Sequence, residues 1–338
     1  MIRFAVIGYG FMGVTHAGQI KRHPQAELVA VVETNPDKIR QTTQGNLGVA
    51  PEQDLLQGVS IFATLQDLVG QEKIDCVSIC LPTHLHRKVA VEALDAGLSV
   101  ICEKPMALTL PDCDAMIAAA KTNQRELIIA QCLRFWPEYE VLKSFLDSGE
   151  LGRVTTLLFR RVSAPPLWTG SDSWFANASQ SGGCVFDLHV HDVDFIHYAL
   201  GRPTAVFSQG LQHRDGLNHS VMTMYEFDPA KICIAEASWI YPLGFKMSYT
   251  AVFEKGLLEY DSSRTPSLTL IRSGDQEAET ITPSPGDGYS REYDYFISCL
   301  SQNQPLDRIR PASARQSIEI ALAEIQSMKE RQKIKLKN

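Results

Sequence analysis

Short apolar runs recur along residues 1–125 and alternate with segments of helical spacing. The runs are nearly continuous in valine, isoleucine and leucine, which is typical of strands covered on both faces. The intervening segments have helical periodicity and N-terminal Asp, Thr or Pro. This alternation predicts a parallel sheet built from βαβ units. Strands are expected at 2–8, 26–33, 60–64, 75–82, 98–104 and 126–132, and helices at 11–23, 35–44, 65–71, 83–97 and 110–124.

The pattern changes after residue 150, where strand-like segments follow one another, mostly without intervening helices. Many alternate apolar and polar positions between short turns, which predicts a largely antiparallel sheet. These strands are expected at 152–164, 203–213, 219–228, 231–242, 245–263 and 267–274, with flanking helices at 181–200, 287–302 and 311–331 and a last strand in the closing RQKIKLK. The fold class is therefore α/β: a parallel-sheet domain over 1–125, then an α/β domain over 126–338 with an open, mainly antiparallel sheet.

Some strands of the second domain are apolar on both faces. In FKMSYTAVF (245–253), the alternate positions from Phe245 to Phe253 share one apolar face, and Val252 adds to the other. Helices on one face of the sheet and a partner subunit on the other would explain this pattern, so we expect a homodimer or homotetramer. The loop over 163–183 is long, and such loops in compact domains are usually functional or mobile.

Composition and charge narrow the classes of function. The 338 residues are 44% hydrophobic and 21% charged, and the net charge of −7 comes from acids and bases spread along the chain. Nucleic acids and anionic membranes require a basic face, so neither is an expected partner. No apolar stretch has the length of a membrane span. The N-terminal MIRFAVIGYG runs into a strand and a glycine turn rather than a signal peptide, so the expected location is the cytoplasm.

The chain has eight cysteines, and none forms a C-x-x-C motif. Most lie in apolar, strand-like runs such as DCVSICLPT. This placement favours buried thiols that act as small apolar side chains over disulfides or a zinc site.

The segment Gly8–Gly13 reads GYGFMG, a complete G-x-G-x-x-G motif between an expected strand and an expected helix. In this context the glycines allow a tight turn, close approach of a pyrophosphate and close helix–strand packing. The helix N-terminus offers unpaired N–H groups to the phosphates. The motif predicts dinucleotide binding through Gly8, Gly10, Phe11, Met12 and Gly13.

Glu33 ends the second expected strand, twenty residues after Gly13. A carboxylate at this place accepts hydrogen bonds from the adenosine ribose and repels a 2′-phosphate. Glu33 therefore favours NAD(H) over NADP(H), and we interpret the nearby Lys38 and Arg40 as solvated helix residues.

Lys104 ends the fifth expected strand, between Glu103 and Pro105. A charged pair at the mouth of a buried strand is costly unless something uses it. The carboxyl ends of strands in such sheets line the ligand crevice. We therefore expect Lys104 beside the nicotinamide, within reach of a substrate hydroxyl, with its backbone restricted by Pro105. The alternative is a surface lysine next to a glutamate.

A second polar cluster lies in GGCVFDLHVHDVDFIHYALG, residues 182–201. Its apolar spacing and closing glycine predict a helix on which Asp187, His191 and Asp194 share one face, while His189 and Asp192 point elsewhere. A histidine beside a carboxylate can act as a general acid or base. The same run also suggests a zinc or iron site, but the helix would divide its ligands between faces, so no metal is expected.

Five segments together resemble the Gfo/Idh/MocA family of oxidoreductases. They are GYGFMG (8–13), LPTHLH (81–86), EKP (103–105), QCLRFWP (131–137) and GGCVFDLHVHDVD (182–194), in the family's order and spacing. The resemblance covers nearly the whole chain and is closest to the inositol dehydrogenase branch. It implies a Rossmann domain, then an α/β domain with an open, mainly antiparallel sheet. It also implies oxidation or reduction of a sugar or cyclitol hydroxyl with a tightly held nicotinamide cofactor.

The resemblance further implies roles for individual residues. Lys104 matches the family's catalytic lysine, and Asp187 and His191 match its second-domain pair. The other residues implied to lie at the cofactor are Pro82, Thr83, His86 and Glu103.

Two positions depart from the family pattern GGG-x-L-x-D-x-G-x-H. Cys184 replaces the third glycine, and His189 replaces the glycine between Asp187 and His191. The Lys/Asp/His set stays intact, but no particular relative's substrate can be carried over.

The expected function is that of an NAD(H)-dependent oxidoreductase that transfers hydride between a sugar, cyclitol or polyol hydroxyl and the nicotinamide. His191, oriented by Asp187, would take the hydroxyl proton while Lys104 stabilises the oxygen, or Lys104 and His191 would exchange roles. Arg134 and Trp174 are candidate substrate contacts, because Trp174 could stack on an apolar sugar face. Two alternatives stay open: an NAD-binding sensor or regulator without turnover, and an NAD-assisted glycoside hydrolase.

Overall fold

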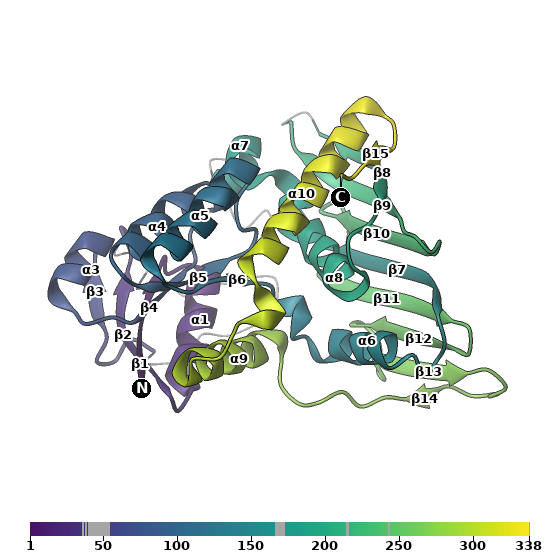
Figure 1. The fold of residues 1–338 in the computed structure, drawn as a ribbon, viewed down its shortest axis with the longest axis horizontal. Helices are drawn as coiled ribbons and strands as arrows, with labels where there is room; N and C mark the ends of the chain where they lie inside the picture. Colours follow the sequence, from purple (N-terminus) through teal and green to yellow (C-terminus); the bar gives the residue numbers. More distant parts are fainter. Residues whose placement is uncertain are drawn as a thin grey trace. The chain divides into compact units, whose positions relative to one another are not determined.

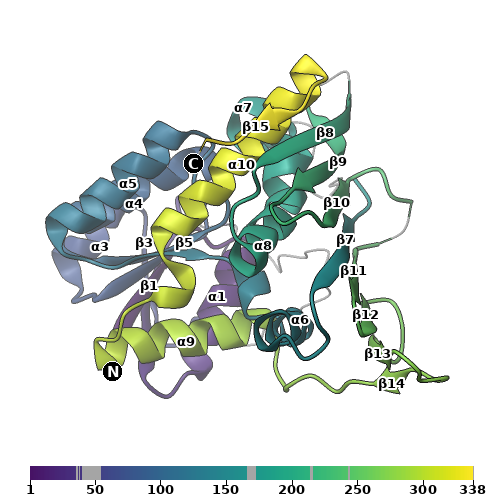
Figure 2. The ribbon, with the colours of Figure 1, turned by 45° about the vertical axis from the view of Figure 1, so that its right-hand side comes forward.

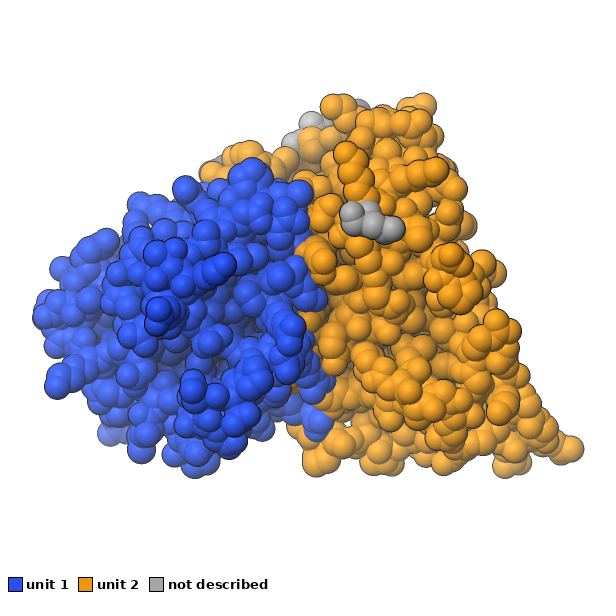
Figure 3. Space-filling view, in the orientation of Figure 1, with its two compact units in different colours: residues 1–132, 289–315 blue, residues 133–288, 316–338 orange. Residues whose placement is uncertain are grey.

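The computed structural model describes residues 1–35, 37, 39, 55–165, 173–213, 216–242 and 244–337. Most of the expected helix at 35–44, with Lys38 and Arg40, and part of the loop at 163–183 lie outside the described residues. The chain divides into two compact units: residues 1–132 with 289–315, and residues 133–288 with 316–338 (Figure 3). This division differs from the expected domains at 1–125 and 126–338, because β6 and the segment 289–315 belong to the first unit.

The first unit is built on a six-stranded sheet with the order β3-β2-β1-β4-β5-β6. All of its strand pairs are parallel, which confirms the predicted βαβ sheet. The strands are β1 (Ile2–Ile7), β2 (Ala26–Val32), β3 (Ser60–Phe62), β4 (Cys76–Ile79), β5 (Ser99–Glu103) and β6 (Leu127–Ala130). Strands β4, in the interior of the sheet, and β6, at its edge, are both buried along their whole length, as expected of continuous apolar runs covered on both faces.

Helices cover both faces of this sheet, with α4 and α5 side by side on one face (Figures 1 and 2). Helices α3 and α5 begin where the side chains of Thr64 and Thr109 accept hydrogen bonds from first-turn amides. The helices are α1 (Phe11–Arg22), α3 (Leu65–Gln71), α4 (Thr83–Asp95), α5 (Leu110–Asn123), α9 (Gly288–Gln302) and the short η5 (Asp307–Ile309), and the turn η1 (Cys132–Arg134) spans the boundary between the units.

Helix α9 was expected to flank the second sheet, and that expectation is wrong. Residues 289–315 belong to the first unit. The Tyr293 hydroxyl lies 2.9 Å from Ser78 Oγ, and the Tyr293 ring meets the His16 ring edge-on at 5.1 Å. A helix pattern shows which face is apolar but not which sheet covers that face, so only the fold decides its partner.

The second unit contains a nine-stranded sheet with the order β14-β13-β12-β11-β7-β10-β9-β8-β15. Strands β7 and β10 pair in parallel and the other pairs are antiparallel, so the predicted mainly antiparallel sheet is confirmed. The strands are β7 (Val154–Val162), β8 (Ala205–Gln212), β9 (Asn218–Glu226), β10 (Ile232–Ser238), β11 (Lys246–Phe253), β12 (Gly256–Asp261), β13 (Leu268–Arg272), β14 (Glu279–Thr280) and β15 (Ile334–Lys335).

Helices of the second unit pack on one face of this sheet, and Tyr139 lies at the centre of that core. Its ring meets those of Phe195 and Tyr249 edge-on at 4.8 and 5.3 Å. Tyr139 lies in α6. This helix was not predicted from the sequence, although Pro137 at its start and Gly149 at its end are typical helix boundaries. The helices are α6 (Pro137–Ser148), η3 (Trp174–Ala176), α7 (Ala178–Ser181), η4 (Val185–His189), α8 (Val190–Leu200) and α10 (Pro311–Glu330).

None of the helices in the described part of the chain is both long enough and apolar enough to cross a membrane.

Candidate active site

The candidate cofactor residues of the first unit gather where four neighbouring strands end. The glycine motif 8–13 follows β1, Glu33 follows β2, Pro82 and Thr83 follow β4, and Glu103 closes β5. Because β2, β1, β4 and β5 are adjacent and parallel, their carboxyl ends share one edge of the sheet. Ligands of open parallel sheets bind at this edge.

The glycines of the motif differ in whether the surrounding protein excludes a side chain. Gly8 has φ +89°, and a Cβ there would lie 2.7 Å from the carbonyl oxygen of Cys80. A Cβ on Gly13 would lie 2.0 Å from the carbonyl oxygen of Gly8, so the close helix–strand contact excludes a side chain. A Cβ on Gly10 would meet no described protein atom within 4 Å. Packing therefore does not require glycine at position 10, whereas close approach of a pyrophosphate does.

Helix α1 begins directly at this open position. Gly10 is its N-cap and provides no side-chain cap. The first-turn amides at Phe11 and Met12, both partly exposed, are thus suited to phosphate oxygens at the positive end of the helix dipole. These residues fit the diphosphate of a dinucleotide.

Glu33 is buried at the end of β2, where two main-chain amides orient its carboxylate. Oε2 accepts a hydrogen bond from the Tyr9 amide at 3.0 Å, and Oε1 accepts one from the Asn35 amide at 2.9 Å. Each oxygen keeps a further lone pair for a ribose hydroxyl. This oriented carboxylate fits the adenosine ribose of NAD and disfavours a 2′-phosphate.

His86 connects the segments that follow β4 and β5. Its Nε2 lies 2.8 Å from the carbonyl oxygen of Leu81, and its Nδ1 lies 2.9 Å from that of Pro105. Burial lowers the pKa of His86, so its ring is neutral and donates to one carbonyl at a time. The structure gives His86 a supporting role, and its direct cofactor contact stays a prediction.

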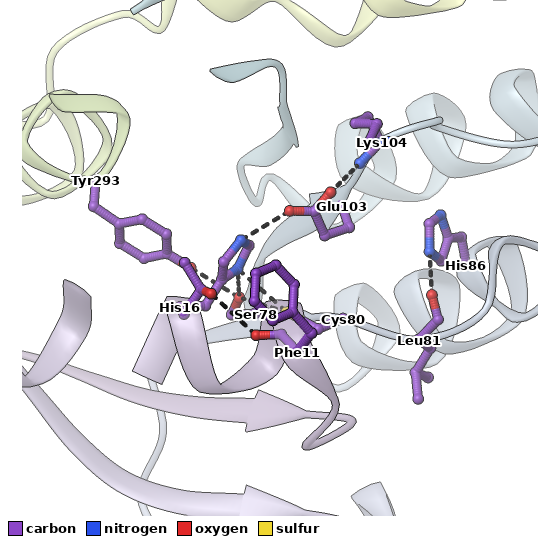
Figure 4. Close-up of polar contacts among 10 residues, drawn as sticks. Phe11, His16, Ser78, Cys80, Leu81, His86, Glu103, Lys104 and Tyr293 are labelled. Atoms are coloured by element: carbon purple, nitrogen blue, oxygen red, sulfur yellow. Dashed lines mark hydrogen bonds and ion pairs between the residues drawn. The ribbon is translucent and has the colours of Figure 1, made fainter. Parts of the chain in front are cut away.

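Glu103 belongs to a network of polar side chains in the interior of the first unit (Figure 4). His16 Nε2 is 2.9 Å from Glu103 Oε1, and His16 Nδ1 is 2.7 Å from Ser78 Oγ and 3.2 Å from Cys80 Sγ. Tyr293 closes the network through Ser78.

The network holds a charged pair. Burial opposes charge on His16, but interactions with Cys80 and Glu103 raise the pKa of His16 well above its usual range. Burial would raise the pKa of Glu103, but the hydrogen bond and charge of His16 and the charge of Lys104 lower it. His16 is therefore a cation and Glu103 an anion at neutral pH.

Lys104 is half-buried, directly after β5, and its amide donates to Glu103 Oε2 at 3.0 Å. The structure thus places the expected acid–base residue at the sheet edge where the candidate cofactor residues lie. The sequence interpretation missed His16, Ser78 and Tyr293. One sequence signal could have indicated His16. It shares the buried face of α1 with Gly13 and Ile20, and a buried histidine needs a polar partner.

In the second unit, Asp187 and His191 lie on consecutive helical segments. Asp187 belongs to the π-helical turn η4, and His191 lies in the first turn of α8. The indole Nε1 of Trp239 donates to Asp187 Oδ2 at 3.0 Å and so orients this carboxylate. Single π-helical turns are frequent at functional sites. Trp239, at the end of β10, was not singled out from the sequence.

The remaining acids of this cluster have structural partners. Asp194 forms a bidentate pair with Arg134, at 2.8 and 2.7 Å, and accepts from Ser317 at 2.8 Å. Asp192 pairs with Arg161 at 2.9 and 3.0 Å. The guanidinium of Arg134 thus holds Asp194 in the core, and its expected substrate contact stays a prediction.

His189 is completely buried and points into the unit. Its Nε2 lies 3.3 Å from Thr223 Oγ1, 3.2 Å from the Tyr225 hydroxyl and 3.3 Å from Glu324 Oε2. With Asp192 and Asp194 paired to arginines, the run 189–194 does not converge on one point. Across the described ranges, no group of three or more His, Cys, Asp or Glu residues could hold a metal ion.

Trp174 lies in η3, near the end of the long loop, and is partly exposed. Its ring meets Phe175 at 4.9 Å, and Phe175 packs against Trp239 at 5.2 Å. Phe175 thus connects Trp174 with Trp239, whose indole donates a hydrogen bond to Asp187. The expected stacking of Trp174 on a substrate stays a prediction.

Comparisons with known proteins cover both units. Residues 2–131 match the family model described as "Oxidoreductase family, NAD-binding Rossmann fold", and residues 139–259 match the GFO/IDH/MocA C-terminal domain. The inositol 2-dehydrogenase of Corynebacterium glutamicum (strain R) is 29% identical over 267 residues, 76% of this chain and 72% of the relative. The myo-inositol 2-dehydrogenase of Thermotoga maritima is 24% identical over 348 residues, 99% of this chain and 98% of the relative.

A solved structure shows the same fold. The WlbA dehydrogenase from Bordetella pertussis, solved in complex with NADH and UDP-GlcNAcA, superposes with a TM-score of 0.83 at 22% identity. The match covers 100% of this chain and 99% of that chain. With both family models matched in order, the chain belongs to the Gfo/Idh/MocA family of oxidoreductases, and residues 2–131 form its NAD-binding Rossmann domain.

Proposed function

We propose that this protein is an NAD(H)-dependent dehydrogenase that acts on a CH–OH group of a cyclitol, sugar or polyol. The observation that carries the proposal is Lys104 at the end of β5, on the same sheet edge as the glycine motif and Glu33. The dehydrogenase relatives from Corynebacterium and Thermotoga support a cyclitol or related polyol as substrate.

Three side chains perform the proton chemistry in this proposal. NAD, when bound, supplies the hydride acceptor. His191, oriented by Asp187, takes the proton of the substrate hydroxyl, and Lys104 hydrogen-bonds the same oxygen and stabilises its developing negative charge. The bond from Trp239 keeps Asp187 in one orientation. An exchange of roles between Lys104 and His191 uses the same groups.

The proposed cofactor contacts follow the strand ends. The diphosphate binds at Gly8–Gly13 and the adenosine ribose at Glu33. The nicotinamide half lies near Pro82, Thr83 and Glu103.

Lys104→Met tests the central assignment. The variant keeps its affinity for NAD but loses turnover by about 10²–10⁴-fold, because a positioned acid–base group contributes that much. NADH fluorescence measures affinity, and absorbance at 340 nm measures turnover. Lys121→Met, on the exposed surface of α5, is the matched control and retains full activity. Near-normal turnover of Lys104→Met contradicts the assignment.

A substrate screen at 340 nm separates this function from its alternatives. Inositols, aldoses and sugar nucleotides are offered with NAD, and net NADH formation from a free polyol or sugar supports the dehydrogenase. Release of a sugar from a glycoside without net NADH indicates an NAD-assisted hydrolase. Tight NAD binding without either reaction indicates a sensor.

We further propose that the open face of the nine-stranded sheet binds a second copy of this chain. Several of its large apolar side chains are about half exposed: Met222 (50%), Met224 (53%), Ile232 (55%) and Leu158 (40%). The strand registers place Leu158 and Met224 in one apolar row across neighbouring strands and Ile232 in another, while Met222 lies opposite Glu236 and Gln209. The rows are Thr250–Leu158–Ile234–Met224–Phe207 and Ile271–Leu257–Val252–Thr156–Ile232.

The charge on this face suits a copy of itself. Arg160 and Glu236 lie on the open face and pair at 3.0 Å. Their opposite charges balance each other, so they do not repel a second copy of the same face. Exposed apolar patches of this kind mark association surfaces, and a self-complementary patch closes into a two-fold dimer.

We also propose a reducing compartment, the cytoplasm, as the place of action. All eight cysteines are free thiols, and seven of them are buried. Proteins of oxidising compartments use cysteines as disulfides far more often.

A further inference from the structure

His16, on α1, is completely buried and has no part in the chemistry proposed above. Helix α1 begins at the glycine motif, whereas Glu103 closes β5. The 2.9 Å contact from His16 Nε2 to Glu103 Oε1 therefore joins the cofactor-binding helix to the strand that carries Lys104 (Figure 4).

Glu103 extends this connection to the main chain of Lys104. Its Oε1 faces His16, and its Oε2 accepts the Lys104 amide at 3.0 Å. A carboxylate held at both oxygens cannot rotate without losing one of these bonds. Loss of the His16 bond would therefore release the carboxylate that orients the Lys104 backbone.

The second nitrogen of His16 is fixed as firmly as the first. Nδ1 faces Ser78 Oγ at 2.7 Å and the titratable Cys80 Sγ at 3.2 Å, and Ser78 bonds Tyr293 at 2.9 Å. Three elements, β4, β5 and α9, thus hold one imidazole ring. Such a ring has a single orientation, which a positioning group requires.

Burial of this pair is costly. Removing two charges from water costs several kcal/mol per ion in typical proteins, and apolar replacements of such pairs are often as stable. The groups that face Glu103 are His16 from α1, His86 from α4 and the neighbouring Lys104. Of these, His16 contributes the hydrogen bond that keeps the Glu103 carboxylate ionised.

We propose that His16 is a positioning residue of this enzyme: through Glu103 it fixes the main chain at Lys104 relative to α1. The proposal rests on the proposed function for the role of Lys104. Its geometric part is the bond between His16 and Glu103, which requires no substrate.

Two substitutions separate the hydrogen bond from the charge. His16→Met fills a similar volume but removes both ring nitrogens. Its kcat falls about 10–100-fold, because small displacements of catalytic groups have effects of that size, whereas the KM for NAD changes much less. His16→Gln keeps an amide donor without a charge and restores part of the lost kcat.

The pH profile gives a readout that a merely structural residue would not change. Without the His16 cation, burial raises the pKa of Glu103, so the carboxylate takes up a proton at a higher pH. The acidic limb of the kcat profile therefore moves upward in pH in both His16 variants. Tyr293→Phe is the comparison variant: it removes the bond to Ser78 but neither ring nitrogen of His16 nor its bond to Glu103, so its acidic limb moves less than that of the His16 variants.

A measurement on the protein without cofactor tests the pair itself. Nitrogen-15 spectra of histidine-labelled protein at pH 8 should contain one ring protonated on both nitrogens, and His16→Gln should remove that signal. A neutral His16 at pH 8, an unmoved acidic limb, or an equal loss of kcat in Tyr293→Phe each overturns the proposal. If no substrate is found, the proposed function fails while the spectra still decide whether the His16–Glu103 pair is charged.

Discussion

Two buried histidines of the first unit have opposite pKa shifts, although burial disfavours charge on both. The pKa of His16 is raised because Cys80 and Glu103 lie against its ring, whereas at His86 burial outweighs the charge of Glu103 and the bonds to two main-chain carbonyls and lowers the pKa. The charge of a nearby partner, rather than depth, decides the protonation state. His16 can therefore hold a carboxylate, and His86 can connect the segments after β4 and β5 without adding a charge.

Arg134 is only 2% exposed, and the carboxylate of Asp194 balances its charge. Arg134→Met leaves Asp194 as a buried carboxylate with no opposite charge. We expect the free energy of unfolding in urea to fall by about 3–5 kcal/mol, the usual cost of breaking a buried pair from one side.

The matched control for this prediction is an ion pair at the surface. Arg153 is 80% exposed and binds Glu254. Because water and salt screen such pairs, Arg153→Met should change the free energy of unfolding little. Equal losses in both variants would contradict the structural role given to Arg134.

At the scale of the element, the turn from β1 into α1 contains glycines with two different functions: close packing within the protein and room for a ligand. Position 13 is closed by the protein's own backbone, whereas a Cβ at position 10, the proposed place of a diphosphate, would meet no described atom within 4 Å. One motif therefore contains a packing glycine and a binding glycine. Substitution by alanine can separate them.

Gly10→Ala should fold as stably as the wild type without cofactor, because its φ of −84° suits alanine and its Cβ meets no described atom. Its affinity for NAD should fall at least about tenfold, since the methyl group occupies the approach of the pyrophosphate. Gly13→Ala should lose both affinity and melting temperature, because its Cβ would clash with the Gly8 carbonyl. Thermal melting without NAD and NADH titration distinguish the two effects, and equal melting temperatures would contradict this division.

At the scale of the whole molecule, the open sheet face predicts the state of assembly. Met224→Lys places a positive charge in the apolar row that contains Leu158 and Ile234. In a two-fold dimer through this face, the lysine of one copy would lie near the lysine of the other. We expect the wild type to have the mass of a dimer or tetramer by light scattering and the variant to shift toward monomer. Val69→Lys, at an exposed apolar position on α3, should leave the mass unchanged. A monomeric wild type at working concentration ends this proposal.

Much of the fold and part of the candidate site follow from local pattern. The strands of the first sheet lie within the apolar runs, because continuous apolar segments can be buried only between two layers of helices. The glycine motif, Glu33 and Lys104 were found because each occupies a strand end, and strand ends of a parallel sheet meet at one edge. The alternation after residue 150 likewise predicts the mainly antiparallel sheet.

Other features depend on contacts between segments that are distant along the chain. Ser78 and Tyr293 are 215 residues apart, and Glu103 meets His16 across 87 residues. No local period encodes such pairs, so the position of α9 in the first unit and the charged partner of Glu103 were not predicted. The sequence by itself determined the layers, the dinucleotide motif and the acid–base candidates, since these depend on spacing along one element. The tertiary structure alone decided which buried charges face each other, because burial and partners set the charge of a side chain.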